Sequence, residues 1–248
     1  MKAILGFLRS LSTAVWLLLI LLVLLLAGAF IMPAREEFEM IHSLPLFRWI
    51  IDQELSATWW LWGAVGVLAV MAANTLTCSI DSVVKKRSTR QWLLIVSPQI
   101  IHLGFLFMLV AHLVTGLQGF KGMAVAAEGM EVRLPNDLVV RVSRISVSVG
   151  QDGSLSDWAV DIAYRAGGTV VGEDRLRPNS PSFRGGIGIY VKDLRPFPQK
   201  LVLLEISREP GALWALIGGV LFMVGTVALI GLKTRRDAPI GPERAEAG

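Results

Sequence analysis

The sequence is poor in cysteine and histidine, two residue types that carry much of protein chemistry. Its 248 residues include one cysteine, Cys78, and three histidines. A single cysteine excludes an internal disulfide and a Cys-x-x-Cys redox pair. We find no Walker loop, no His-Glu-x-x-His motif, no dinucleotide fingerprint and no Ser/His/Asp spacing. Intramolecular thiol chemistry is therefore excluded, and the common chemistries of soluble enzymes are poorly represented.

Charge is also scarce, and the uncharged residues gather in long runs. Only 18% of the residues are charged, whereas 53% are hydrophobic and the mean hydropathy is +0.58. Four segments contain no charged residue, namely 11–34, 55–80, 91–120 and 210–232. Each exceeds the roughly 20 residues that an α-helix needs to cross a bilayer. The sequence predicts four transmembrane helices, which we place within 1–34, 57–80, 97–120 and 210–232.

The charges at the ends of these helices predict their orientation. Basic residues gather before the first helix, between the second and third, and after the fourth, at Lys2, Arg9, Lys85, Lys86, Arg87, Arg90, Lys233, Arg235 and Arg236. By the positive-inside rule the termini, the 81–96 link and the 233–248 tail are cytoplasmic. The acidic loop 35–56 and the nearly neutral segment 121–209 then lie outside. The net charge of +4 is an orientation signal, and we expect no nucleic-acid binding.

Three local features add detail to this plan. The apolar segment 44–51 has acidic neighbours and predicts a short helix in the membrane interface. Trp59, Trp60 and Trp62 open the second helix and are typical of an aromatic belt. Residues 27–29, Ala-Gly-Ala, fit a signal-peptidase site. The uncharged run around them is longer than a usual signal sequence, so we expect the first helix to be retained.

Segment 121–209 is long enough for one small folded domain. Apolar and polar residues alternate over 138–149, 158–164, 187–192 and 200–207, which is the period of half-buried strands. Turn-forming residues occur at 150–153, 167–168, 178–181 and 185–186. We predict a mostly antiparallel sheet of five or six strands between the third and fourth helices. The fold class is therefore a membrane protein of the α+β type, with one extracytoplasmic β domain.

Two of the three histidines lie within the third predicted helix. An imidazole inside a membrane normally faces protein or a water-filled cavity, so it is a functional candidate. His102 is the first candidate ligand of a metal or cofactor and His112 the second, while packing against a neighbouring helix is the alternative for both. They lie about 15 Å apart along the helix and about 80° apart around it, so they cannot clamp one heme iron. A heme held by two histidines would need a partner chain, because His42 lies on the outer loop.

Two other features have both a structural and a functional interpretation. Cys78 lies in the small, polar stretch 74–81, whose composition suits packing against another helix, and it is either a reactive thiol or a packed small residue. Residues 179–190, a turn leading into a strand, are either purely structural or part of a functional surface. The outer segment contains no histidine or cysteine, so we do not expect it to ligate a transition metal by itself.

Five motifs follow one another along the whole chain. They are Phe7-Leu8-Arg9-Ser10-Leu11 with Ala14 and Trp16; Trp60 to Asn74 with Cys78 to Asp81; His102-Leu103-Gly104 to Gly116 with Gly119-Phe120-Lys121-Gly122; Asn179-Ser180-Pro181 to Gly186 with Tyr190; and Arg208-Glu209-Pro210-Gly211 with Gly218 and Gly225. In this order the chain resembles the ResB family, also called CcsB, of system II cytochrome c maturation. Its outer segment is far shorter than in typical members, so the resemblance is to a short variant.

The resemblance implies a subunit of the bacterial cytoplasmic (inner) membrane that carries heme b outward for attachment to apocytochrome c. His102 matches the third-helix histidine, which in the family holds heme together with a histidine of a CcsA-type partner. His112 matches no family residue, and no catalytic residue is implied for this chain. Two other functions stay open: a non-catalytic scaffold of an envelope redox complex, and a b-type cytochrome subunit.

Overall fold

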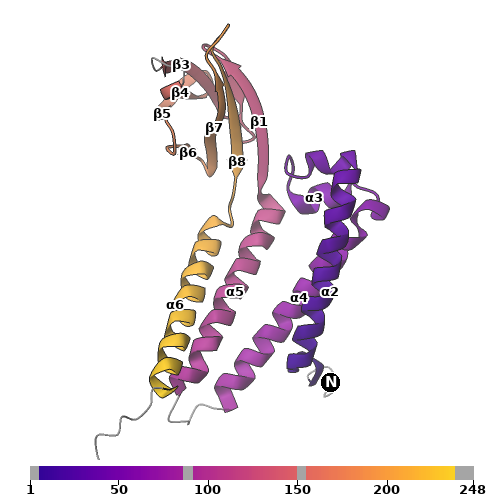
Figure 1. The fold of residues 1–248 in the computed structure, drawn as a ribbon. Coiled ribbons are helices and arrows are strands. Elements are labelled where there is room, and N and C mark those ends of the chain that lie inside the picture. The colour runs from indigo at the N-terminus through magenta and orange to yellow at the C-terminus, as the bar shows by residue number, and fades with distance from the viewer. Residues whose placement is uncertain (1–5, 86–91, 150–154, 238–248) are drawn as a thin grey trace, which may run out of the picture. The chain divides into compact units, whose positions relative to one another are not determined.

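The computed structural model describes residues 6–85, 92–149 and 155–237. These residues belong to two compact units. The first comprises Met1–Phe38, Ile51–Leu113 and Gly211–Gly248 and is helical; the second comprises Glu39–Ile50 and Val114–Pro210 and is mostly β. The combination of long apolar helices with antiparallel strands agrees with the predicted α+β class (Figure 1).

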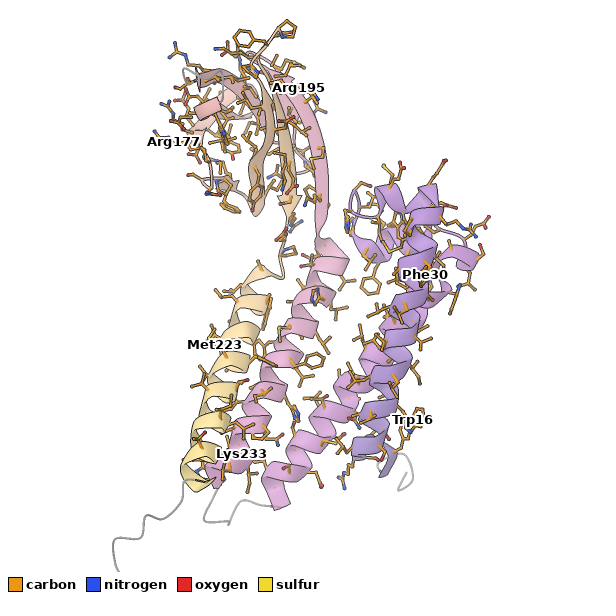
Figure 2. All side chains as sticks on the ribbon, viewed as in Figure 1. Trp16, Phe30, Arg177, Arg195, Met223 and Lys233 are labelled. Atoms are coloured by element: carbon orange, nitrogen blue, oxygen red, sulfur yellow. The ribbon has the colours of Figure 1, made fainter. Side chains whose placement is uncertain are left out.

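Four helices are long and apolar enough to cross a membrane: α2 (Leu11–Ile31), α4 (Leu55–Lys85), α5 (Trp92–Gln118) and α6 (Ala212–Asp237). Large apolar side chains such as Trp16, Phe30 and Met223 project outward from them (Figure 2). Such exposure suits lipid contact. Shorter elements follow α2, namely η1 (Met32–Ala34), η2 (Glu36–Met40) and α3 (Leu46–Ile51). The helix α3 forms at the apolar segment 44–51, and its place in a membrane interface stays a prediction.

Two helices extend beyond their expected ends. Helix α5 begins at Trp92, so that Pro98 lies inside it, although we expected a start near residue 97. The hydroxyl of Ser97 donates to the carbonyl of Leu93, 2.7 Å away. Helix α4 continues past Asp81, whose carboxylate lies 3.6 Å from the guanidinium of Arg9. A charged residue ends an apolar run but need not end the helix, as Asp81 and its ion pair with Arg9 show.

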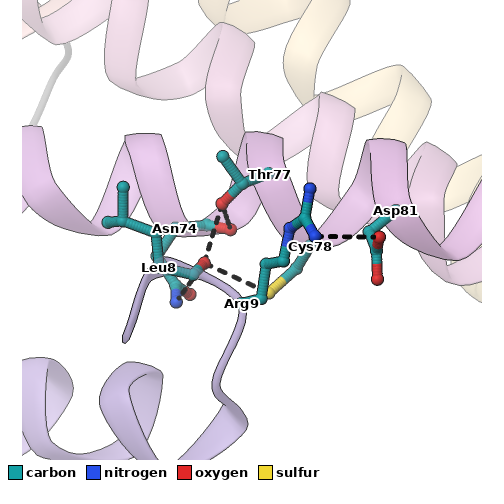
Figure 3. Close-up of polar contacts among 6 residues, drawn as sticks. All are labelled: Leu8, Arg9, Asn74, Thr77, Cys78 and Asp81. Carbon is teal, nitrogen blue, oxygen red and sulfur yellow. Dashed lines mark hydrogen bonds and ion pairs between the residues drawn. The ribbon is translucent and has the colours of Figure 1, made fainter. Parts of the chain in front are cut away.

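The stretch 74–81 packs against the chain just before α2 (Figure 3). The carbonyl of Leu8 accepts hydrogen bonds from Thr77 Oγ1 at 2.7 Å and Asn74 Nδ2 at 3.0 Å, with Cys78 Sγ at 3.6 Å. Asn74 also donates to the carbonyl of Ser10, 3.3 Å away. These contacts are partly buried, so α4 supplies donors to carbonyls that would otherwise be costly to leave unpaired. The polar composition of the stretch thus serves helix packing, and Cys78 takes part in it.

Replacing Asn74 with alanine is expected to lower the free energy of unfolding by about 0.5–1.5 kcal/mol, because its side-chain amide donates to the carbonyls of Leu8 and Ser10 in a part-buried contact. SDS titration of the full chain in mixed micelles measures this change. Val70→Ala, on an exposed position of the same helix, is the control and should cost less. Equal losses for the two variants would contradict the role of Asn74.

Trp60 differs from its neighbours in the expected aromatic belt. It is only 4% exposed, whereas Trp59 and Trp62 are exposed. Its ring lies against Gly28 of α2, where an added Cβ would be 2.5 Å from a ring carbon, and 6.2 Å from the ring of Phe38. The belt prediction is wrong for Trp60, because a glycine on the adjacent helix makes room for the indole. For the other two tryptophans it stays a prediction.

Helices α5 and α6 approach closely through glycines. A Cβ added at Gly104 would lie 2.6 Å from the carbonyl oxygen of Gly218, and one added at Gly218 would lie 2.7 Å from that of Gly104. Farther along, a Cβ at Gly225 would lie 2.9 Å from the backbone nitrogen of Ile101. Small residues at such positions allow backbones to pack directly, as in membrane helix pairs.

The β unit contains two antiparallel sheets. One has the order β1 (Phe120–Ala127), β8 (Leu201–Arg208), β7 (Ile187–Arg195), β6 (Ser182–Arg184); the other has β2 (Glu131–Arg133), β3 (Val139–Val149), β4 (Leu155–Ala166), β5 (Thr169–Leu176). The antiparallel arrangement was predicted, but the single sheet of five or six strands is wrong. β2 and β6 have three residues each, too few to show alternation, and the mostly exposed β5 lacks an apolar face.

The two sheets share one core of aliphatic side chains, which includes Val142, Ile145, Val160, Val202 and Leu204, all fully buried. Gly167 and Gly168 connect β4 to β5, and both have positive φ angles. Gly185 and Gly186 connect β6 to β7 in the same way. These turns were predicted from sequence, while the expected turn at 150–153 lies outside the described residues.

Residues 179–190 have a structural role in this unit. Ser182 Oγ lies 2.8 Å from the hydroxyl of Tyr164 and donates to the carboxylate of Asp174. The guanidinium of Arg184 lies over the Tyr164 ring, 5.2 Å from its centroid. Burial raises the pKa of Tyr164, which therefore stays neutral and able to donate. The network joins β6 of one sheet to β4 and β5 of the other.

Candidate functional site

His102 lies on α5 at its contact with α4. Its imidazole is half-buried, and Nδ1 is 3.2 Å from the hydroxyl oxygen of Ser79 on α4. A hydrogen bond at one ring nitrogen fixes the ring and selects the tautomer. If Nδ1 carries the proton and donates to Ser79, Nε2 presents its lone pair. This is the arrangement that a histidine needs in order to ligate a metal.

A groove of about 360 Å³ runs beside this histidine, between α4 and α5. Six of its lining side chains are aliphatic, and the other two are Ser79 and Gln99. The α5 wall consists of Gln99, Leu103 and Leu106. Positions 99, 102, 103 and 106 form one stripe on a helix, so His102 belongs to the same face. The walls of the groove are therefore mainly apolar, and His102 is tied to them through its contact with Ser79 rather than lining the groove itself.

Gln99 adds a polar group to the groove wall. Its amide oxygen Oε1 is buried and has no hydrogen-bond partner among the residues that the structure describes. A buried acceptor without a donor is unfavourable by about 1–3 kcal/mol. A water molecule or a ligand in the groove would relieve this cost.

The other candidate residues, His112, Cys78 and His42, do not contact His102 in the described part of the chain. His112 also lies on α5 but is exposed, and Cys78 lies at the Leu8 contact. His42 lies beside strand β1, where its backbone carbonyl accepts a hydrogen bond from the Lys121 amide, 2.7 Å away. Within residues 6–85, 92–149 and 155–237, no group of three or more His, Cys, Asp or Glu side chains could hold a metal ion.

Sequence analysis missed Ser79 and Gln99 as members of this site. Ser79 lies in the polar stretch 74–81, and Gln99 precedes His102 by almost one helical turn. The available signal was that each is a polar residue within a long uncharged segment of the sequence. Which faces of α4 and α5 meet depends on packing, which hydropathy does not encode.

Comparisons with known proteins identify no family for this chain. No protein-family model and no curated protein matches the sequence. Among solved structures the fold is similar to one described as Cytochrome c Heme Lyase CcmF, with a TM-score of 0.45 and 14% sequence identity. The match covers 86% of this chain and 34% of that one, so the chain spans about a third of the length of that protein.

Proposed function

We propose that this chain is a heme-delivery subunit of a system II cytochrome c synthetase, and that His102 ligates heme iron together with a histidine of a CcsA-type partner. The observation that carries the proposal is the contact between His102 and Ser79 beside an apolar groove. The motifs that resemble the ResB family support the same role. No residue of this chain is proposed to make or break the thioether bonds of cytochrome c.

Each part of the site has a role in this proposal. Ser79 Oγ would accept a hydrogen bond from Nδ1–H of His102 and leave the lone pair of Nε2 free for the iron, as hydrogen-bonding partners of metal-ligating histidines do in other sites. The aliphatic walls from α4 and α5 would contact the apolar porphyrin ring of the heme and keep water away from it. Gln99 Oε1 accepts from a water molecule or a protonated carboxyl group of the bound molecule. The heme itself supplies the iron and later the vinyl groups that react with apocytochrome c.

The expected orientation agrees with delivery outward. By the positive-inside rule the groove lies in the cytoplasmic half of the inner membrane, where heme b would enter. The β unit then lies outside and contacts the partner and apocytochrome c. Since neither His112 nor His42 lies with His102, the second axial ligand would come from the partner.

Replacing His102 with alanine is expected to remove most of the heme that copurifies with this chain and its CcsA-type partner, because the iron loses an axial ligand. The absorption spectrum of the purified complex measures heme content. His112→Ala, the other histidine of α5, is the matched control and should retain heme. Added imidazole should restore the spectrum of His102→Ala. Unchanged heme in that variant contradicts the proposed ligand.

A non-catalytic scaffold is the second candidate, because a histidine that hydrogen-bonds to Ser79 also fits simple helix packing. It predicts no heme in either single variant or in the wild-type complex. It also predicts intact cytochrome c in a strain that lacks this chain. The two candidates are therefore separated by the wild-type spectrum before any variant is made.

A further inference from the structure

Strand β1 leaves one of its edges open. It pairs with β8 in an unbroken antiparallel register, from Phe120 opposite Arg208 to Ala127 opposite Leu201. The amide of Lys121 nevertheless donates to the carbonyl of His42, 2.7 Å away, and so points away from β8. In an antiparallel ladder, alternate residues direct their backbone groups to the same side. The amides and carbonyls of Met123 and Val125 therefore face the edge that Lys121 faces.

Only the middle of this edge, at Met123 and Val125, lacks a backbone partner in the described part of the chain, because the Ala127 carbonyl at the far end accepts from the Met130 amide, 3.1 Å away. Beyond the Lys121 amide, no backbone hydrogen bond connects Met123 or Val125 to a segment outside the sheet. Figure 1 shows β1 at the margin of its sheet. The side chains of Met123 and Val125 are 58% and 59% exposed. Two apolar side chains thus stand beside four unpaired backbone groups.

The other sheet margins are protected in ways that β1 is not. Strands β2 and β6 have only three residues each, and β5 carries Glu173, Asp174 and Arg175 in succession. Short length and charge are the usual means by which proteins prevent edge pairing. β1 has eight residues, no proline and a single charged residue, Lys121. An unprotected edge on an otherwise protected domain indicates a binding surface.

We propose that the free edge of β1 binds an extended peptide segment of a partner protein as an added strand. Backbone amides and carbonyls in a row are matched by the same groups of another extended chain. The bond from His42 to Lys121 already supplies the first rung of this pairing. Met123 and Val125 select a segment with apolar residues at alternate positions, since these lie on the same face of the extended sheet.

A second copy of this chain fits the edge less well. Two β1 strands paired antiparallel about Ala124 would place Met123 opposite Val125 of the other copy. The same register places Ala127 of one copy opposite Lys121 of the other, and the Lys121 amide is already bound by His42. A short segment of another protein can end before that position. This inference does not depend on heme binding.

Amide hydrogen exchange of the full chain in nanodiscs tests the proposal, with a ten-residue peptide of alternating valine and threonine, flanked by lysines, as the probe. Without peptide, the Met123 and Val125 amides should exchange faster than the Ala124 amide, which faces β8. Saturating peptide should slow both by at least about tenfold and leave Val170, an equally exposed residue of β5, unchanged.

Two variants at Val125 distinguish the contribution of its backbone amide to peptide binding from that of its side chain. Val125→Pro removes the edge amide without touching the β8 ladder, and should abolish peptide binding while Ala124 stays protected. Val125→Thr keeps the amide and should still bind. Three results would overturn the proposal: protection of Met123 and Val125 without peptide, equal peptide affinity of Val125→Pro, or protection that appears only on raising the concentration of the chain itself.

Discussion

Gly218→Val is expected to disrupt the packing of α6 against α5. A Cβ at this position would lie 2.7 Å from the carbonyl oxygen of Gly104 and 2.9 Å from the backbone nitrogen of Met108. Backbone atoms of a helix cannot move aside as a flexible side chain can, so the helices must separate. Overpacking costs typically about 1–3 kcal/mol, and more where backbones must move. We expect a loss in free energy of unfolding at or above the upper end of this range.

Gly219→Val is the matched control, because a Cβ added there meets nothing within 4 Å. The two variants add the same side chain to adjacent residues of one helix and differ only in what it meets. SDS titration followed by the tryptophan fluorescence of the whole chain measures both, because Trp214 of α6, 5.6 Å from Phe107 of α5, contributes to that signal. A loss equal to that of Gly219→Val would show that the glycine contact is unimportant.

The contact with α6 also bears on His102. Ser97, Ile101, Gly104 and Met108 of α5 meet α6, while Gln99, Leu103 and Leu106 face the groove with α4. His102 therefore stands on a helix that is held from two sides. A substitution on α6 that displaces α5 changes the distance between His102 and Ser79 without altering either residue. If His102 ligates heme as proposed, the heme content of the Gly218→Val complex should fall with stability, as a consequence of the same displacement.

Hydropathy predicted the elements of this fold better than their contacts. Uncharged runs located the four long helices, because burial in lipid requires an apolar composition along the whole segment. Trp59 and Trp60 have the same composition signal, yet only Trp60 is buried, since it meets Gly28. That contact joins residues far apart in the chain. A local pattern cannot distinguish two adjacent tryptophans whose surroundings differ in this way.

The same limit applies to the candidate site. His102 was evident from sequence because an imidazole in an apolar run is costly unless it has a partner. Its partner Ser79 was not evident, because serine is unremarkable in a membrane helix and its facing residue depends on how α4 and α5 pack. In the β unit, alternation revealed the long strands, but β2 and β6 are too short to carry a pattern.

Removing both lysines that neutralise Glu205 is expected to destabilise the β unit strongly. Glu205 lies on β8 between β1 and β7, and its side chain is only 7% exposed. Its Oε2 is 3.0 Å from Lys121 Nζ and 3.2 Å from Lys192 Nζ. Lys121→Met with Lys192→Met would leave a buried carboxylate without a counter-charge, which costs about 3–5 kcal/mol. Each single variant should cost less, because one lysine remains.

Adding Glu205→Gln to the double variant distinguishes lost charge balance from lost packing. The neutral amide keeps the shape of the side chain, so the triple variant should recover most of the stability. Arg195→Met removes the guanidinium 3.8 Å from the exposed carboxylate of Asp193 and should cost less than about 1 kcal/mol. Urea unfolding in nanodiscs, followed by exchange of the buried Leu204 amide, measures all five variants. A triple variant no more stable than the double would show that the lysines act through packing, and that the carboxylate of Glu205 needs no counter-charge.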